Sequence, residues 1–105
     1  MRLLTSSGKQ KKPRTLIIRR VKGESMLPKL KPEQIILASS RIRLRTNQVV
    51  VVRREGLEVV KRLSKMAGSR VYITGDNAPK STDSREFGWI SKDDVLATVI
   101  WPRMT

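Results

Sequence analysis

The chain of 105 residues contains neither histidine nor cysteine. Without cysteine it has no disulfide, no thiolate metal ligand and no thiol nucleophile, and without histidine it lacks the usual zinc ligands and the imidazole general base. No apolar segment approaches the roughly 18 residues of a membrane-spanning helix, and the N-terminus lacks the apolar run of a cleavable signal peptide. We therefore expect no metal, no cofactor and a location in the cytoplasm or at the periphery of a membrane.

Acidic residues are scarce, with 9 against 23 lysines and arginines, which gives a net charge of +14. Such a charge attracts nucleic acid, an anionic membrane surface or an acidic partner, and charge alone does not choose among them. The few aromatic residues argue against a platform that stacks nucleic-acid bases. Asp93 and Asp94 could contact a hard cation, although two adjacent carboxylates in a turn are usually solvated. A non-catalytic basic module that binds nucleic acid or another polyanion therefore remains an alternative.

The chain changes character near residue 14. Residues 1–13 are polar, basic and aperiodic, so we expect a flexible basic tail followed by a single domain over residues 14–105. The domain contains short apolar runs rich in valine and isoleucine and separated by turn residues. These runs predict a mostly β fold, a small antiparallel curled sheet or partial barrel, with at most one helical turn near residues 91–94. The predicted strands contain residues 16–18, 35–37, 49–52, 57–63, 71–73 and 95–101.

One hairpin can be predicted in register, because Glu55 and Gly56 form a two-residue loop between two valine-rich strands. This register pairs Arg53 with Glu58, and it places one lysine, Lys61, among apolar side chains. Desolvation would lower the pKa of that lysine, and a value of roughly 7–8 would require ~3–4 kcal/mol. The alternative is a lysine whose amine reaches water. The predicted face contains Val50, Val52, Leu57, Val59, Lys61 and Leu63.

A second candidate is Ser25, which lies where the first predicted strand ends. In a chain without histidine, a neutral lysine amine is the remaining common activator of a serine hydroxyl. The residues around Ser25 could form a tight turn that exposes its hydroxyl and offers its own N–H to an oxyanion. A plain polar turn is the alternative. We expect four neighbouring residues to line a substrate cleft: Gly23, Met26, Leu27 and Pro28.

A third segment, residues 75–85, has the composition of a long loop. Asp83 and Arg85 are close enough in sequence to form an ion pair that braces it. Either Ser81 or Ser84 could orient an amine by hydrogen bonding. A purely structural loop would have the same composition, so this segment gains meaning only in combination with the other two.

In combination, the three segments resemble the signal peptidase I family and its Ser-Lys peptidase relatives, which include LexA-type repressors. The matching motifs are Gly23-Glu24-Ser25-Met26-Leu27-Pro28, Val60-Lys61-Arg62-Leu63 and Gly75-Asp76-Asn77 with Ser81-x-Asp83-Ser84-Arg85-x-x-Gly88, and they cover about residues 15–102. The resemblance implies that Ser25 is the nucleophile, Lys61 the general base and Ser81 the hydroxyl that orients it. It also implies a structural salt bridge between Asp83 and Arg85.

The same resemblance implies cleavage after small residues in an extended chain that is bound by strand addition, and thus a serine endopeptidase that removes a leader or propeptide. Some family members carry an oxyanion-binding hydroxyl two residues before the nucleophile, where this chain has Gly23. The chain shows no membrane anchor and no large insertion, as in short maturation proteases of nickel-type superoxide dismutase, the subgroup we favour. The expected partner is a precursor protein or peptide, with contact to an anionic membrane surface an open question and nucleic acid not expected. Self-cleavage, as in LexA-type repressors, is a further alternative, although no upstream DNA-binding domain is evident.

Overall fold

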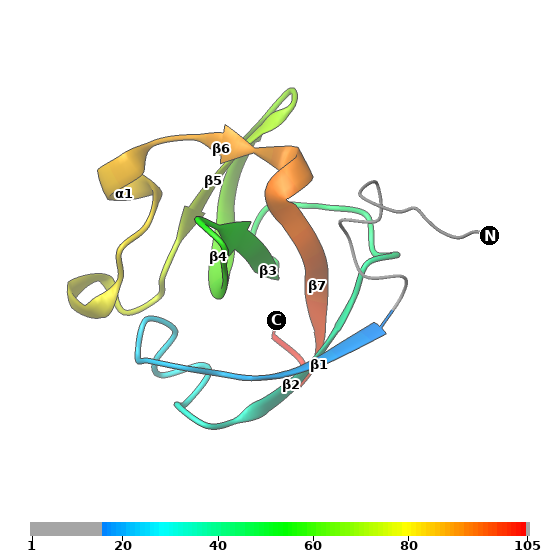
Figure 1. Cartoon of the computed structure of the whole chain (residues 1–105), viewed down its shortest axis with the longest axis vertical. Coiled ribbons are helices and arrows are strands. Elements are labelled where there is room, and N and C mark those ends of the chain that lie inside the picture. Colours follow the sequence, from blue (N-terminus) through cyan, green and yellow to red (C-terminus); the bar gives the residue numbers. More distant parts are fainter. Residues whose placement is uncertain (1–15, 105) are drawn as a thin grey trace.

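The computed structural model describes residues 16–104, so the predicted tail at 1–13 and the outermost residues of the predicted domain lie outside the described residues. The described chain folds into one antiparallel sheet whose strands follow the order β1-β2-β7-β3-β4-β5-β6. The sheet curls into a half-barrel, with β1 and β2 crossing below the β3–β4 hairpin (Figure 1). The predicted mostly β, curled architecture is therefore confirmed. The strands are β1 (Leu16–Arg20), β2 (Ile35–Ser39), β3 (Val49–Arg54), β4 (Leu57–Ala67), β5 (Arg70–Thr74), β6 (Ile90–Ser91) and β7 (Val95–Trp101).

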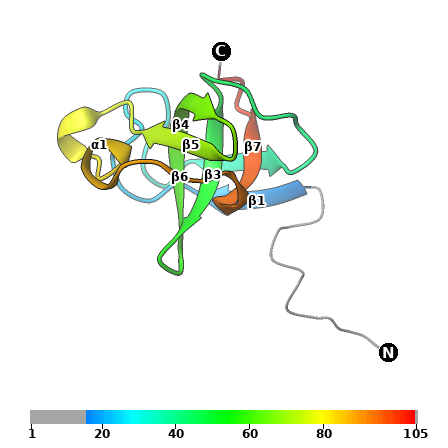
Figure 2. The ribbon, with the colours of Figure 1, turned by 90° about the horizontal axis from the view of Figure 1, so that it is seen from above.

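Three irregularities in the ladder bend the sheet. The register shifts at Leu37/Ala38 between β2 and β7, at Val51/Val52 between β3 and β7, and at Leu63/Lys65 between β4 and β5. A bulge adds local twist to an antiparallel pair, and twist allows a sheet to curl around its own side chains. Figure 2 shows the curl from above, with the β3–β4 hairpin projecting from the body.

Both faces of the central strand are buried. Val49 and Val51 pack into one apolar cluster, and Val50 and Val52 pack into another on the opposite face. Alternating side chains point to opposite sides of a strand, so four consecutive buried valines indicate a strand covered on both faces. The first cluster is completed by residues from β1, β2, β7 and the turn after β1, and by Met104 beyond β7. The second is completed by residues from β4, β5, β6 and β7.

The predicted hairpin register is confirmed: Arg53 pairs with Glu58, Val52 with Val59, and Val50 with Lys61. The predicted shared face needs one correction. Leu57 is 68% exposed, because it lies at the hairpin tip beyond the reach of the apolar cluster. The remaining apolar residues of this face line the cluster beside Lys61.

The helical content was predicted only in part. The turn near residues 91–94 is confirmed as η3 (Lys92–Asp94), with the Ser91 hydroxyl accepting from the Asp93 N–H. Two further turns, η2 (Ala78–Lys80) and α1 (Ser84–Phe87), interrupt the segment that was predicted as a loop. They are too short to show a helical period in the sequence. No helix within residues 16–104 has the length and apolar character needed to cross a membrane.

Candidate active site

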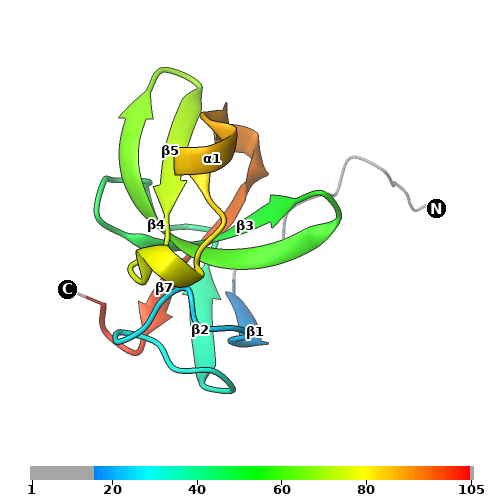
Figure 3. The same ribbon diagram turned by 90° about the vertical axis from the view of Figure 1, so that its left-hand side faces the viewer.

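The turn that follows β1 carries Ser25 and is tied to the segment that follows β5. The Asn77 backbone N–H donates to the Ser25 carbonyl at 2.8 Å, and the Asn77 side-chain amide donates to the Glu24 carbonyl at 3.0 Å. Figure 3 shows these two loops meeting at the centre of the molecule. Within residues 16–104, neither the hydroxyl nor the N–H of Ser25 makes an internal hydrogen bond, so both can face a substrate.

Lys61 lies on β4 opposite Val50 and is only 5% exposed. The buried apolar cluster beside it includes Val50, Val52 and Leu63. Burial lowers the pKa of Lys61, because an ammonium loses its hydration in such a place. The Asp83 carboxylate opposes this shift and the Arg85 guanidinium adds to it, and the pKa of Lys61 remains below its ordinary value.

A chain of hydrogen bonds holds the amine of Lys61. Its Nζ donates to Ser81 Oγ at 2.8 Å, and the Ser81 hydroxyl donates to Asp83 Oδ2 at 2.5 Å. Arg85 donates two hydrogen bonds to the same carboxylate, from Nε to Oδ1 at 3.0 Å and from a terminal nitrogen to Oδ2 at 2.6 Å. The predicted pairing of Asp83 with Arg85 is therefore present in the structure.

This chain of hydrogen bonds fixes the direction in which protons are donated. Because the single proton of the Ser81 hydroxyl points to Asp83, the Ser81 oxygen can only accept from Lys61. A neutral Lys61 then uses one N–H for Ser81 and keeps its lone pair free. The amine is thus oriented without losing its capacity to accept a proton.

Asp83 is the centre of this network and is fully buried. Burial acts to raise the pKa of Asp83, but hydrogen bonds from Arg85, from Ser81 and from the Gly75 N–H together hold it far below its usual range. The Gly75 N–H donates to Asp83 Oδ2 at 2.7 Å, and the Gly75 carbonyl accepts from Arg85 at 2.9 Å. Asp83 therefore stays ionised at every physiological pH.

Gly75 lies between the two halves of the site, and only glycine fits there. A Cβ at this position would collide with the Ser81 hydroxyl and would lie 2.7 Å from the Ser25 carbonyl oxygen. Both contacts are shorter than carbon atoms tolerate, and neither partner is the free end of a flexible side chain. The absence of a side chain at residue 75 thus lets the serine turn approach the lysine network.

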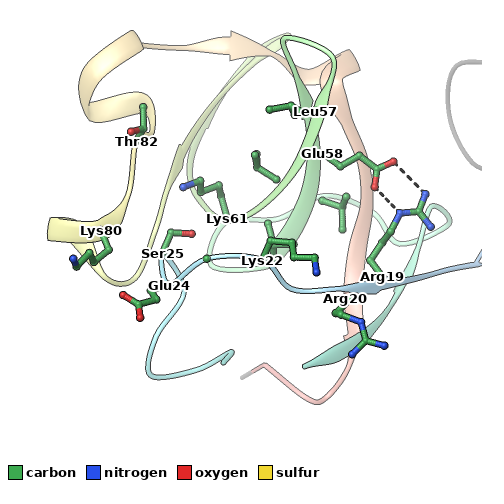
Figure 4. A pocket seen from close by; sticks show the side chains of 14 residues that line it. Arg19, Arg20, Lys22, Glu24, Ser25, Leu57, Glu58, Lys61, Lys80 and Thr82 are labelled. Atoms are coloured by element: carbon green, nitrogen blue, oxygen red, sulfur yellow. Dashed lines mark hydrogen bonds and ion pairs between the residues drawn. The ribbon is translucent and has the colours of Figure 1, made fainter. Parts of the chain in front are cut away.

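Ser25 and Lys61 line one pocket with a volume of about 500 Å³. Figure 4 shows the Lys61 amine and the Ser25 hydroxyl at the same end of this pocket. The pocket extends from there along the segment after β1 and the first residues of β4. Its lining consists of Arg19, Arg20, Lys22, Gly23, Glu24, Ser25, Val51, Leu57, Glu58, Val59, Val60, Lys61, Lys80 and Thr82.

Of the four residues predicted to line a substrate cleft, Gly23 lines this pocket and the other three do not. The prediction for Met26 is wrong, since its side chain is 1% exposed and packs in the first apolar cluster. Leu27 and Pro28 follow it in the turn and lie outside the lining. The sequence could not separate an apolar residue that faces a cleft from one that anchors a turn in the core.

The structure also separates the two serines that could orient an amine. Ser81 contacts Lys61, whereas the buried hydroxyl of Ser84 accepts from the Ile73 N–H of β5 at 2.8 Å. Sequence reasoning gave no role to Asn77, although its two hydrogen bonds hold the serine turn. It also missed Arg62, which is adjacent to Lys61 and binds Asp76 at 2.6 Å. The matched motifs contained these residues, but only the fold shows what they contact.

Within residues 16–104, no three carboxylates come together in a group that could hold a metal ion. A search of curated proteins gives no match to this chain. A family model for Peptidase S24-like proteins matches residues 2–97, which is most of the chain. The chain therefore belongs to the Peptidase S24-like family and, with it, to the clan of Ser-Lys serine peptidases and LexA-type autoproteases.

Proposed function

We propose that this protein is a serine endopeptidase in which Ser25 is the nucleophile and Lys61 the general base. The observation that carries the proposal is the buried amine of Lys61, held by Ser81 and lining the same pocket as Ser25. A buried lysine with a lowered pKa can be neutral near physiological pH and accept a serine proton. Membership of a serine peptidase family agrees with this assignment.

In the proposed reaction, the Ser25 hydroxyl attacks the scissile carbonyl while its proton moves to Lys61 Nζ. The resulting oxyanion is bound by the free Ser25 N–H, and Gly23 supplies no side-chain donor. The Lys61 ammonium next gives its proton to the leaving amine, which breaks the peptide bond and leaves an acyl ester on Ser25. Lys61 then takes a proton from a water that attacks this ester and gives it to Ser25 Oγ as the acid product leaves, which restores the serine hydroxyl and the neutral lysine.

The network behind Lys61 has a defined part in each step. Ser81 keeps the amine directed toward the pocket, so its lone pair is available when Ser25 must lose a proton. The buried charge of Asp83 stabilises the ammonium that forms transiently, while Arg85 keeps Asp83 ionised. This arrangement corresponds to the base-orienting group of other serine peptidases.

The free edge of β4 supports an extended substrate. Residues 57–61 pair with β3, whereas β5 joins β4 only from Arg62, which pairs with Thr74. The opposite edge of residues 57–61 therefore has no strand partner in the described part of the chain, and all five residues line the pocket. An extended peptide could add to this edge through main-chain hydrogen bonds, which places its scissile bond near Ser25.

For the substrate, we propose a precursor that is cut after small residues to release a leader or propeptide. This part of the proposal rests on the resemblance of the three motifs to signal peptidase I. The run Ser81-Thr82-Asp83-Ser84-Arg85-Glu86-Phe87-Gly88 favours the maturation proteases of nickel-type superoxide dismutase. Contact with an anionic membrane surface is part of the proposal to be tested, as is self-cleavage of the LexA type.

The test is cleavage of a peptide panel with Ala-x-Ala before the scissile bond, with and without anionic vesicles. We expect wild type to cut and Ser25→Ala to be inactive. Lys61→Arg is the sharpest variant of the base, because arginine keeps the charge but cannot lose its proton near neutral pH. Ser69→Ala and Lys65→Ala, which change exposed residues outside the pocket, are the matched controls.

Cleavage that persists in Ser25→Ala or Lys61→Arg would contradict the assigned roles. A second candidate function is the non-catalytic basic module, which the net charge of +14 favours. It predicts no cleavage by any variant, together with salt-sensitive nucleic-acid binding that Ser25→Ala leaves intact. Autocatalytic shortening of the chain, absent in Ser25→Ala, would instead indicate self-cleavage.

A further inference from the structure

The pocket that contains Ser25 and Lys61 is lined by charges of mostly one sign. Five basic residues and two acidic residues contribute to its lining. Lys61 is buried and serves as the proposed base, which leaves four cations at the rim. These are Arg19, Arg20, Lys22 and Lys80.

One acidic residue of the lining is already neutralised. Arg19 binds Glu58 through Nε at 2.5 Å and through a terminal nitrogen at 3.1 Å, so the two charges cancel across the pocket mouth. This pair joins β1 to β4 at the far end of the pocket from Ser25 (Figure 4). The other acidic residue of the lining is Glu24, and three cations remain.

Those three cations are incompletely neutralised. Arg20 and Lys22 share the single carboxylate of Glu33, at 3.8 Å and 3.3 Å, and all three side chains are largely exposed. Lys80 has no ion-pair partner within residues 16–104. Figure 4 shows Lys80 on one side of Ser25 and Lys22 with Arg20 on the other.

We infer that the substrate carries acidic side chains on the residues that flank its scissile bond, where they pair with Arg20, Lys22 and Lys80. The inference rests on the proposed peptidase function and names the substrate class of that site. A chain bound along the free edge of β4 passes between these cations, so its side chains come within their reach. The net charge of +14 adds a long-range attraction for such a substrate.

The experiment compares three peptides that share the same Ala-x-Ala cleavage segment and differ in flanks: Asp/Glu, Ser/Gln or Lys. Exposed ion pairs contribute about 1.5- to 5-fold each. We expect wild type to show kcat/KM about tenfold higher for the acidic than for the neutral peptide, mostly through KM. Raising the salt from 50 to 500 mM should remove most of this preference, because screening weakens exposed pairs.

Charge-reversal variants show which cations of the pocket produce the preference for the acidic peptide. In Lys22→Glu and Lys80→Glu, the ratio of acidic to neutral kcat/KM should fall about three- to fivefold, and the lysine-flanked peptide should gain. The matched control is Lys92→Glu, which makes the same charge change on an exposed residue outside the pocket and should leave the ratio unchanged. An equal fall in Lys92→Glu would assign the effect to net charge and overturn the inference.

Binding to the Ser25→Ala variant separates this inference from the proposed function. Fluorescence anisotropy measures the Kd of the labelled acidic and neutral peptides without any cleavage. Efficient cutting of the neutral peptide without an acidic preference would overturn the inference and leave the peptidase function standing. A different outcome is that no peptide is cut, that the acidic peptide binds more tightly than the neutral one, and that a Ser25→Ala/Lys22→Glu double variant loses this difference. That outcome would support the inference and contradict the peptidase function.

Discussion

The two halves of the site are built differently. Lys61 is buried, belongs to a central strand pair and is held through Ser81 to a fully buried Asp83. Ser25 is half-buried and lies on a turn, where its carbonyl accepts from the Asn77 N–H. The proposed base is therefore fixed before substrate arrives, while the proposed nucleophile makes no internal hydrogen bond within residues 16–104. A lysine needs burial and a fixed neighbour to be a base, whereas a serine needs access.

The largest expected effect on this contrast comes from Asp83→Asn. The substitution leaves Arg85, Ser81 and the Gly75 N–H with a neutral partner in a buried place, so we expect a loss of about 3 kcal/mol in the free energy of unfolding. Urea denaturation at pH 7 measures it. Ser25→Ala, on the weakly held side, should change this free energy by less than about 0.5 kcal/mol. Equal losses in the two variants would remove the contrast.

Gly75→Ala disrupts the contact between the serine turn and the hydrogen-bond network of Lys61. The new methyl group would displace Ser81 and the Ser25 carbonyl, and a shift of about 1 Å in a catalytic group can cost about 100-fold in rate. We expect a loss of that size in kcat, measured by peptide cleavage. Gly68→Ala is the control, because residue 68 has open space but a φ of 58°. It should cost about 1 kcal/mol of stability and leave kcat unchanged.

The pH dependence should follow Lys61. Because burial lowers the pKa of Lys61, kcat/KM should rise with pH as the amine loses its proton and level off below the pH at which a free lysine titrates. The unfolded chain binds more protons than the folded chain between the two pKa values, so stability also rises with pH in that window.

Lys61→Met tests the sign of this effect. The substitution removes the free-energy cost of burying the lysine ammonium. The variant should therefore be more stable than wild type, with the largest difference at low pH, and this difference should shrink as pH rises toward the pKa of free lysine. Urea denaturation at pH 6 and pH 9 gives the comparison. A difference that grows with pH would mean that the ammonium is the favoured form in the folded state.

The smallest expected effect comes from Asn77→Ala. It removes the side-chain hydrogen bond to the Glu24 carbonyl but keeps the backbone bond to Ser25. We expect kcat to fall by roughly three- to tenfold and stability to fall by less than about 1 kcal/mol. A rise in KM with kcat unchanged would instead indicate that Asn77 binds substrate rather than positioning the serine turn.

The sequence predicted best where local chemistry decides the structure. The valine-rich strands and the Glu55-Gly56 loop gave the hairpin register, and that register placed Lys61 among apolar side chains. It predicted least where distant segments meet. Nothing local indicates that Asn77 binds the turn of Ser25, or that Met26 packs in the core, because both depend on how the sheet curls. The turn α1 depends on the Asp83 side chain accepting from the Arg85 N–H, and four residues show no period.

The four buried valines at residues 49–52 also have a consequence for local unfolding. The strand is covered on both faces and paired with β4 and β7, so we expect its amides to exchange with solvent only when the whole domain unfolds. The segments that carry Ser25 and Ser81 belong to no strand, so we expect them to open at a lower free energy than the sheet. A transient opening would therefore release the serine turn while Lys61 remains paired opposite Val50. The site would then re-form each time on the unchanged β3–β4 pair.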